Sequence, residues 1–129
     1  MGQQQLLLIV LGVIVVGIAI VVGIQLFNSS SVQANRDAVV SDINHLASLA
    51  VEYYKKPTSM GGGGNAFTNF ALPTELDTTA NGIFSISVAG NATGITFDAK
   101  GTELSTDGSL VEYTGVVNTK GVVTLTKVH

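Results

Sequence analysis

The sequence predicts an α+β fold, in which the second half of one long N-terminal helix packs on an antiparallel sheet of four or five strands. Three observations predict this fold. Residues 6–27 are almost entirely apolar, residues 28–56 continue with helical periodicity, and residues 83–129 alternate apolar and polar side chains. A repeat of 3.6 residues is typical of a helix and a repeat of two is typical of a strand. We therefore expect four segments, at residues 1–27, 28–56, 57–82 and 83–129.

The first segment has the length and composition of a helix that avoids water. The first 35 residues carry no charged side chain, and the apolar ones are concentrated from Leu6 to Phe27. At about 1.5 Å per residue this stretch forms a helix of about 33 Å, enough to cross a bilayer core. It is too long for a secretory signal peptide and lacks a basic start. No Lys or Arg flanks it, which disfavours a plain membrane anchor.

Residues 28–56 are expected to continue the same helix as an amphipathic segment. Lys55 and Lys56 suit the negative end of the helix dipole, and Pro57 ends the helix. A helix from Leu6 to Lys56 is about 76 Å long and exceeds the diameter of a domain of this size, so its first half must project. The apolar side chains that recur at helical spacing are Val32, Val39, Ile43, Leu46, Ala50 and Tyr53.

Residues 57–82 are expected to form a long connection. The four glycines at residues 61–64 are the strongest breaker of regular structure in the chain. No strand precedes them and no Gly-Lys-Ser/Thr follows, so they do not match a phosphate-binding loop. We expect Phe67, Phe70 and Leu72 to hold this connection against the helix or the sheet.

Residues 83–129 are expected to form an antiparallel meander. The alternating segments are 84–88, 95–98, 111–114 and 123–126, and a short strand at 101–105 leaves the number of strands at four or five. Turn signals separate them at Gly90-Asn91, Ala99-Lys100-Gly101, Asp107-Gly108 and Asn118-Thr119-Lys120-Gly121. One face is expected to be wet, with Ser85, Ser87, Thr124 and Thr126. The amphipathic half of the helix is the only available cover for the other face.

The sequence contains no constellation typical of an enzyme, and we expect no catalytic residue, cofactor or bound metal. His45 and His129 lie far apart in sequence, and neither has a second ligand at metal-binding spacing. Glutamate and aspartate are also not spaced as in a calcium-binding loop or a catalytic pair. The acidic residues considered for such chemistry are Glu75, Asp77, Asp98, Glu103 and Asp107.

Composition restricts the partners and the possible modifications. The net charge is −3 without a cluster of Lys or Arg, so a nucleic-acid surface is not expected. The chain has no cysteine, so packing, sheet hydrogen bonds or assembly must stabilise it instead of disulfides. Asn28-Ser29-Ser30 and Asn91-Ala92-Thr93 are acceptor sequons, which makes Asn28 and Asn91 candidate glycosylation sites in an organism that modifies asparagine.

This order of segments resembles the type IV pilin superfamily. The resemblance rests on the N-terminal helix, about residues 1–56, and covers the β domain in class only. It implies many copies in a helical filament on the cell surface, with the apolar helices in the filament core. It also implies storage in the inner membrane before assembly, an inner-membrane assembly machinery as partner, removal of a leader by a dedicated peptidase, and a methylated N-terminus.

The chain departs from the family pattern at two places. The onset of the apolar run at Leu6 puts Gln5 where most family members carry a glutamate. Glutamine accepts a hydrogen bond but does not supply the charge thought to neutralise a neighbouring N-terminal amine. The common helix-breaking proline is also absent. We place any unwinding between Gly12 and Gly23, where Gly17 also weakens the helix by about 1 kcal/mol relative to alanine.

Two arrangements of the leader are open. In the first, Met1 is the mature first residue. In the second, Met1-Gly2 is a residual leader that is cleaved before Gln3. We prefer the first because it places Gln5 at the position of the family's glutamate. We expect the glutamines to hydrogen-bond to neighbouring chains in the filament core. The residues expected to act in assembly are Met1, Gln3, Gln4, Gln5, Leu6, Gly12, Gly17 and Gly23.

Three functions are consistent with the sequence. The first is a structural, major subunit of a type IV pilus-like extracellular filament. The second is a pseudopilin of type II secretion or a minor pilin, which shares the fold but does not polymerise alone over micrometres. The third is a periplasmic binding domain on a single-pass membrane anchor, which stays in the membrane fraction when cells are sheared.

Overall fold

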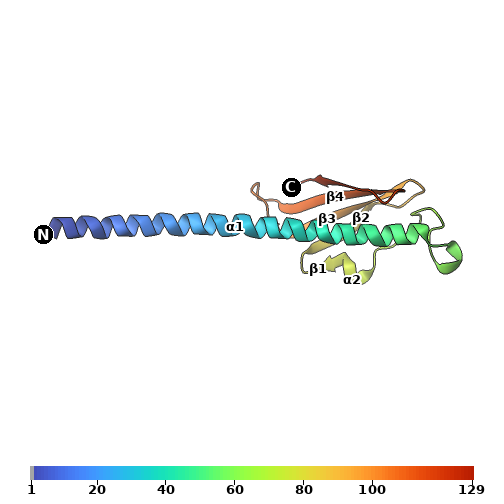
Figure 1. The fold of residues 1–129 in the computed structure, drawn as a ribbon, viewed down its shortest axis with the longest axis horizontal. Coiled ribbons are helices and arrows are strands. Elements are labelled where there is room, and N and C mark those ends of the chain that lie inside the picture. The colour runs from blue at the N-terminus through green and yellow to red at the C-terminus, as the bar shows by residue number, and fades with distance from the viewer. Residues whose placement is uncertain (1) are drawn as a thin grey trace.

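A computed structural model describes residues 2–129 and confirms the α+β fold (Figure 1). Helix α1 runs from Gly2 to Lys55, and its 54 residues make a rod of about 81 Å. The N-terminal part extends away from the rest of the molecule, whereas the C-terminal part lies along one face of the sheet (Figure 1). We call residues 2–27 the stem and the remainder the domain.

Helix α1 has no break in the stem. The unwinding that we placed between Gly12 and Gly23 is therefore not a property of the single chain. Each glycine costs about 1 kcal/mol, but the backbone hydrogen bonds on either side are retained and nothing in an isolated chain competes with them. The helix ends at Lys55, one residue before the expected end. Pro57 lies just beyond it and precedes the next short helix.

The sheet is a meander of five antiparallel strands in the order β1-β2-β3-β4-β5. Helix α1 contacts β3, β4 and β5 and covers one face, as expected. The polar residues predicted on the other face, Ser85, Ser87, Thr124 and Thr126, are exposed. The strands are β1 (Thr78–Thr79), β2 (Gly82–Val88), β3 (Gly94–Leu104), β4 (Leu110–Asn118) and β5 (Val123–Lys127).

Strand β3 corrects one part of the prediction. The turn expected at residues 99–101 is absent, because a single strand joins the segments predicted at 95–98 and 101–105. Pairing with β4 continues through Lys100, and the register shifts only after it. Gly101 is buried against α1 rather than placed in a turn. The fifth strand is therefore β1, which lies in the segment that we expected to be irregular.

Strand β2 corrects a second detail. Phe84 is buried and Ile86 is half-buried, as the alternation predicts, but Val88 is exposed. The register between β2 and β3 shifts between Ile86 and Val88, and such an irregularity reverses the side of the sheet on which the following residue lies.

The connection between α1 and β2 is more ordered than expected. It contains the 3-10 helix η1 (Thr58–Met60), the short helix α2 (Thr74–Asp77) and strand β1. Phe67 is fully buried, and Phe70 and Leu72 pack partly buried against the core, which confirms their predicted role. The Phe67 ring lies 4.9 Å from the Tyr54 ring of α1, centroid to centroid.

The glycine run closes the C-terminal end of α1. The Gly63 N–H donates to the Tyr53 carbonyl at 2.8 Å, and the Gly64 N–H donates to the Lys56 carbonyl at 3.0 Å. These carbonyls have no partner within the helix, so the run satisfies them. Gly64 has φ +58, a left-handed conformation that glycine adopts readily.

The core forms two adjoining clusters between α1 and the sheet. The buried residues of the cluster nearer the stem are Val39, Ile43, Leu46, Phe84 and Ala99. Those of the farther cluster are Ala47, Ala50, Phe67, Ile95, Phe97 and Val117. Every buried side chain of the described chain belongs to residues 35–117, so the stem contributes nothing to this core.

Candidate functional site

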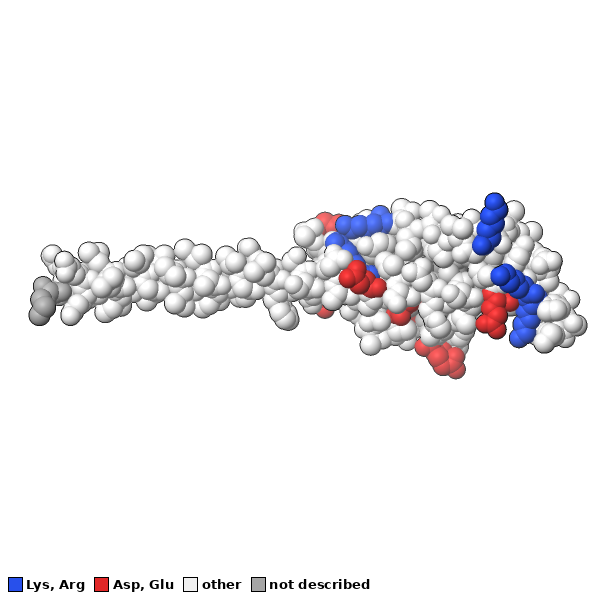
Figure 2. Space-filling view, viewed as in Figure 1, with Lys and Arg blue, Asp and Glu red and all other residues white. Residues whose placement is uncertain are grey.

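The stem is the most distinctive surface of the molecule. All its Leu, Ile, Val and Phe side chains between Leu6 and Phe27 are 47–73% exposed. They lie on every side of the helix. No charged side chain interrupts them, and the face seen in Figure 2 carries none along the stem. A helix that is apolar all round is stable only when it is surrounded. Burial of each such side chain contributes about 1.5–3 kcal/mol, so water is the least favourable surrounding for the stem.

The predicted assembly residues all lie on this stem. Gln3, Gln4 and Gln5 are helical and exposed, and Leu6 begins the apolar surface. The glutamine side chains form no hydrogen bond with the described residues, which leaves their amides available. Met1, which we also expect to act in assembly, lies outside the described residues.

The stem glycines form open notches in the apolar surface. A Cβ on Gly12, Gly17 or Gly23 would meet nothing within 4 Å. Gly12 and Gly23 are eleven residues apart, about three turns, and therefore share one side of the helix, whereas Gly17 lies on another side. Small residues allow helix backbones to approach closely, so two sides of the stem can accept neighbouring helices at short distance.

Asn35 fixes the stem relative to the domain. It is buried in α1, its Oδ1 accepts the backbone N–H groups of Thr102 and Glu103 at 3.1 and 3.3 Å, and its Nδ2 donates to the Asn81 carbonyl at 2.9 Å. Gly101 lies directly opposite, since a Cβ there would be 2.1 Å from Oδ1. Our sequence analysis missed this contact. The available signal was an asparagine in the helical stripe between Val32 and Val39.

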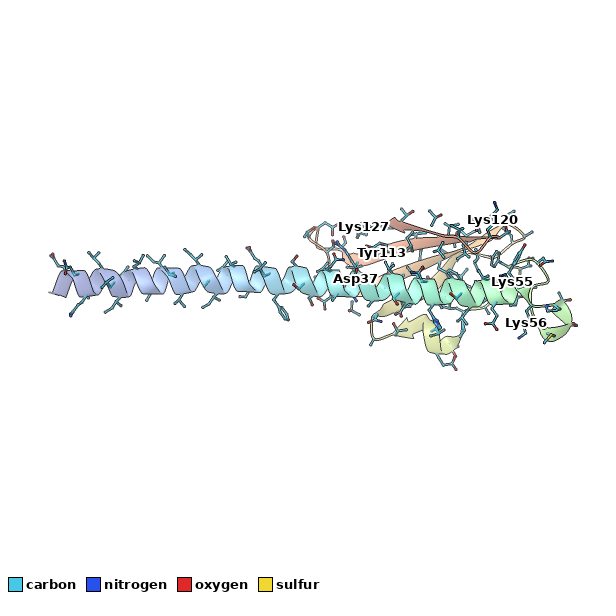
Figure 3. The ribbon with its side chains drawn as sticks, viewed as in Figure 1. Asp37, Lys55, Lys56, Tyr113, Lys120 and Lys127 are labelled. Carbon is cyan, nitrogen blue, oxygen red and sulfur yellow. The ribbon has the colours of Figure 1, made fainter. Side chains whose placement is uncertain are left out.

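The charges are confined to the domain (Figure 2). Lys55, Lys56 and Lys120 lie at the end far from the stem, and Asp37 lies nearer to it (Figure 3). No Lys or Arg of residues 2–129 forms an ion pair with an Asp or Glu. The Lys and Arg side chains therefore have no carboxylate partner within residues 2–129, whereas the stem offers uncharged surface only.

The two histidines do not form a metal site. His45 is exposed on α1, and His129 lies beside two carboxylates, with Nδ1 3.2 Å from Asp107 and Nε2 3.9 Å from Glu112. The pKa of Asp107 is lowered, chiefly because its carboxylate accepts the Ser109 N–H at 2.9 Å and also because His129 is close. Because Asp107 and His129 lie far apart in sequence, the sequence gave no indication that their side chains are in contact.

The acidic residues are not gathered into one site. Asp98 accepts the Thr114 hydroxyl at 2.9 Å within the sheet, whereas Asp107 is in the β3–β4 turn. Glu75 is exposed and Asp77 is half-buried in α2. Among residues 2–129, no group of three or more His, Cys, Asp or Glu side chains is placed to hold a metal ion.

The two sequons lie in different surroundings. Asn28 is exposed within continuous α1. Asn91 is exposed in the β2–β3 loop, where its Oδ1 accepts the Thr93 N–H at 2.7 Å and the Thr93 hydroxyl at 2.6 Å. Of the two candidate glycosylation sites, Asn91 is the one in a loop, at a distance from the stem.

Comparison with known proteins adds no relative. No family model, no curated protein and no solved structure matches this chain. What is established is an α+β domain that carries one uncovered apolar helix, long and apolar enough to cross a membrane, with a mean hydropathy of 3.3 over its most apolar 18-residue window.

Proposed function

We propose that this chain is a structural subunit of an extracellular helical filament of the type IV pilus kind, and that it polymerises through its stem. One observation carries the proposal: about 33 Å of helix, apolar on every side, extends beyond a domain whose own core is complete without it. Before assembly the stem lies in the inner membrane, where a helix satisfies its own backbone groups.

Assembly exchanges lipid contacts for contacts between stems. Because one stem cannot cover all sides of another, each must be surrounded by several copies. A repeated contact between different surfaces that does not close gives a helical polymer. The notches at Gly12, Gly17 and Gly23 allow close packing, and the domains form the outer layer. The glutamines at residues 3–5 hydrogen-bond to neighbouring chains in this core.

The first test is electron microscopy of material sheared from the surface of producing cells, together with mass measurement of its N-terminal peptide. We expect filaments composed of this chain, with a processed N-terminus. A chain that stays as a monomer in the membrane fraction after shearing would contradict the proposal and favour the anchored binding domain. Filaments that form only with other subunits would favour the minor-subunit alternative.

A matched pair of substitutions then locates the polymer contact. Val16→Glu places a carboxylate in the middle of the stem, where an unpaired buried charge is strongly unfavourable, and should abolish filaments. Thr124→Glu adds the same charge on the exposed sheet face and should leave filaments intact. Equal filament yields from the two variants would show that the stem is not the polymer core.

The glutamines are tested separately. Replacing Gln3, Gln4 and Gln5 by leucine keeps the stem apolar and removes their amides, so we expect impaired assembly with normal membrane insertion. The insertion is measured by fractionation and the assembly by filament yield. Normal filaments from the triple variant would exclude a role for the amides while leaving the role of the stem untouched.

A further inference from the structure

Three lysines gather at the end of the domain far from the stem (Figure 3). Lys55 is the last residue of α1 and Lys56 follows it, whereas Lys120 is in the β4–β5 turn, where a Cβ on Gly121 would contact Val51 of α1. Val51 and Lys55 are four residues apart and share one side of the helix, so this turn brings Lys120 close to the other two lysines. We call Lys55, Lys56 and Lys120 the lysine end.

The lysine end has a net positive charge. Its three side chains are exposed, and none is within ion-pair distance of an Asp or Glu of residues 2–129. The one acidic residue within residues 44–72 and 117–123 is Glu52, one helical turn before Lys56. Three positive charges and one negative charge leave a net charge of +2 at this end of the domain.

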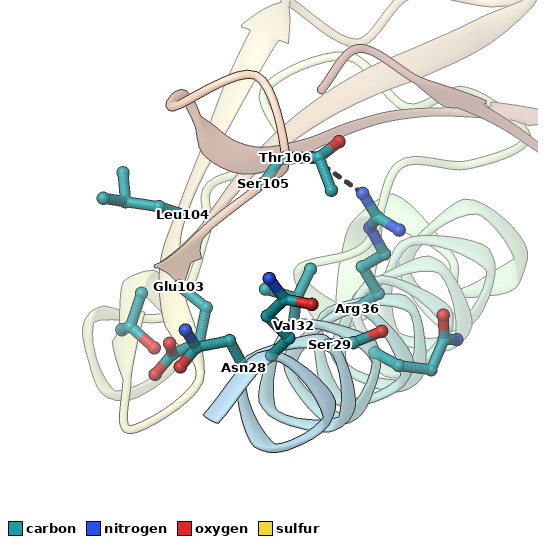
Figure 4. Close-up of a pocket in the computed structure, with 11 residues that line it drawn as sticks. Asn28, Ser29, Val32, Arg36, Glu103, Leu104, Ser105 and Thr106 are labelled. Atoms are coloured by element: carbon teal, nitrogen blue, oxygen red, sulfur yellow. Dashed lines mark hydrogen bonds between the residues drawn. The ribbon is translucent and has the colours of Figure 1, made fainter. Parts of the chain in front are cut away.

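The opposite end of the domain carries the other sign. Residues 103–110 form the tip of the β3–β4 hairpin and carry two charged side chains, Glu103 and Asp107, so we call this segment the acidic tip. Asp107 is exposed in the turn, where it contacts His129 at 3.2 Å, and Glu103 is half-buried at a cleft of about 700 Å³ between the tip and α1 (Figure 4). Neither carboxylate forms an ion pair with a Lys or Arg of residues 2–129.

The cations nearer to the stem are not directed at the acidic tip's carboxylates. Arg36 donates from its Nη2 to Ser105 Oγ at 2.8 Å, which holds the tip against α1 (Figure 4). Lys100 and Lys127 lie opposite residues 112–113 of β4, so both are set back along the sheet from the turn. The acidic tip therefore presents negative charge at the end of the domain that faces the stem.

A parallel second copy can bring the two ends together. The acidic tip lies across the cleft from Ser29, and Lys55 is 26 residues beyond Ser29, about 39 Å along α1. A copy shifted by this distance places its acidic tip at the lysine end of the first copy. Its stem then lies beside α1 of the first copy, displaced sideways by about 10 Å, the diameter of a helix. Lysine side chains are long and flexible, so they span such an offset.

The stems alone do not fix this shift between copies. Their surface from Leu6 to Phe27 is uncharged and mostly aliphatic, and hydrophobic contacts have no preferred direction. Complementary charges, in contrast, favour one register and disfavour those in which like charges face each other. An exposed ion pair contributes little by itself, so a contact of this kind acts among copies that their stems already hold together.

We propose that the acidic tip of each copy docks on the lysine end of the next copy along the filament, so that the partner of both surfaces is a second copy of this chain. The inference rests on the filament of the proposed function, and it adds a contact between domains that sets the shift between copies. The contact pairs lysines and carboxylates that have no such partner within one chain.

The first test uses cysteine pairs in sheared filaments, because the native chain has no cysteine. Thr106→Cys with Thr119→Cys places one exposed thiol beside each docking surface and keeps every charge. Within one copy these positions lie at opposite ends of β4, whose nine residues span about 30 Å, so a short bismaleimide cross-linker joins different copies only. We expect a ladder of covalent multimers under denaturing conditions.

The matched control is Ser85→Cys with Thr119→Cys. Ser85 is exposed on the outer face of the sheet, in the middle of β2 and away from both docking surfaces. Filaments of this variant carry the same number of thiols, and we expect few or no multimers from them.

Charge reversal tests the pairing itself. Lys55→Glu with Lys120→Glu turns the contact into a repulsion and should lower the filament yield about tenfold or more. Lys100→Glu with Lys127→Glu changes the net charge by the same amount away from the lysine end, and should preserve filaments. Hydrogen exchange at β3 and β4 shows that each variant is folded.

A compensating change should restore filaments to the variant with reversed lysines. Glu103→Gln, Thr106→Lys and Asp107→Asn together make the tip positive, and an asparagine at position 107 keeps an acceptor for the Ser109 N–H. These three substitutions by themselves should lower the yield as much as the reversed lysines do. Combined with the reversed lysines, they should restore most of the yield.

Three results would overturn the inference. They are filaments that give no ladder from the Thr106 and Thr119 pair, equal ladders from that pair and the control, and a full yield or a failed rescue after charge reversal. Absence of filaments from the wild type would refute the proposed function and the inference with it. Wild-type filaments without these cross-links would refute the inference alone.

Discussion

Replacing Asn35 by alanine should destabilise the domain by about 2–3 kcal/mol. The substitution removes the acceptor of two backbone N–H groups of β3 and the donor to the Asn81 carbonyl. Each lost hydrogen bond costs about 1 kcal/mol in this partly buried setting. The gain in helix propensity from asparagine to alanine, about 0.6 kcal/mol, offsets a small part of the loss.

The control is Asn44→Ala on the same helix. Asn44 is exposed and its side chain makes no hydrogen bond with residues 2–129, so this variant reports the propensity gain alone. Urea unfolding of residues 28–129 provides the free energies, because that segment retains every buried residue. The chain has no tryptophan, so fluorescence of tyrosines such as Tyr54 and Tyr113, which pack against the core, follows the transition.

Gly101 provides a second, more stringent test of the same contact. Gly101→Ala places a Cβ 2.1 Å from Asn35 Oδ1, and overpacking of this kind costs about 1–3 kcal/mol. In the double variant Asn35→Ala with Gly101→Ala the clashing oxygen is gone. The double variant should therefore be less destabilised than the sum of the two single variants, by about 1 kcal/mol or more.

The reasoning is refuted if the two substitutions are additive within about 0.5 kcal/mol, the range found for independent sites. It is equally refuted if Asn35→Ala and Asn44→Ala unfold at the same urea concentration. In either case the angle between stem and domain would depend on the apolar core and not on this amide.

Three further predictions follow from the same geometry. Removal of residues 1–27 should give a soluble monomer, measured by light scattering, because the long continuous run of exposed apolar side chains lies in the stem. Phe67→Ala should cost about 3–5 kcal/mol in urea unfolding, because the ring is fully buried between α1 and the sheet. The pKa of the Asp107 carboxyl, followed by NMR, should lie below its ordinary value of 3.8 and stay below it in His129→Ala, because the Ser109 N–H is the larger cause. Since folding lowers this pKa, the charged form stabilises the fold at neutral pH, and that stabilisation is lost as the pH falls from about 3.8 through the folded value.

Each of these expectations has a contrary result. Oligomers of the truncated chain would locate an assembly surface on the domain. A loss in Phe67→Ala no larger than in Met60→Ala, an exposed site, would mean that the connection is not held by its aromatic ring. Return of the Asp107 pKa to its ordinary value in His129→Ala would make the histidine the main cause.

Local patterns in the sequence were sufficient for the main elements of the fold. The apolar run, the helical stripe from Val39 to Ala50 and the period of two after residue 83 each report a local preference that the structure confirms. Contact between distant residues was not available from such patterns. The predicted turn at residues 99–101 was wrong. Gly101 lies within β3, and a glycine is needed there because the side chain of Asn35, 66 residues away in sequence, packs against it.

The candidate sites divide in the same way. The sequence alone determined that the stem is apolar, uncharged and too long to be covered by its own domain, because length and hydrophobicity are properties of consecutive residues. Only the tertiary structure decided that Asn35 holds the helix to β3, that Arg36 and Glu103 line one cleft, and that His129 lies beside Asp107. These contacts depend on the register of α1 against the sheet, which is set by packing across the core, so a local signal such as an asparagine in the helical stripe does not name its partner.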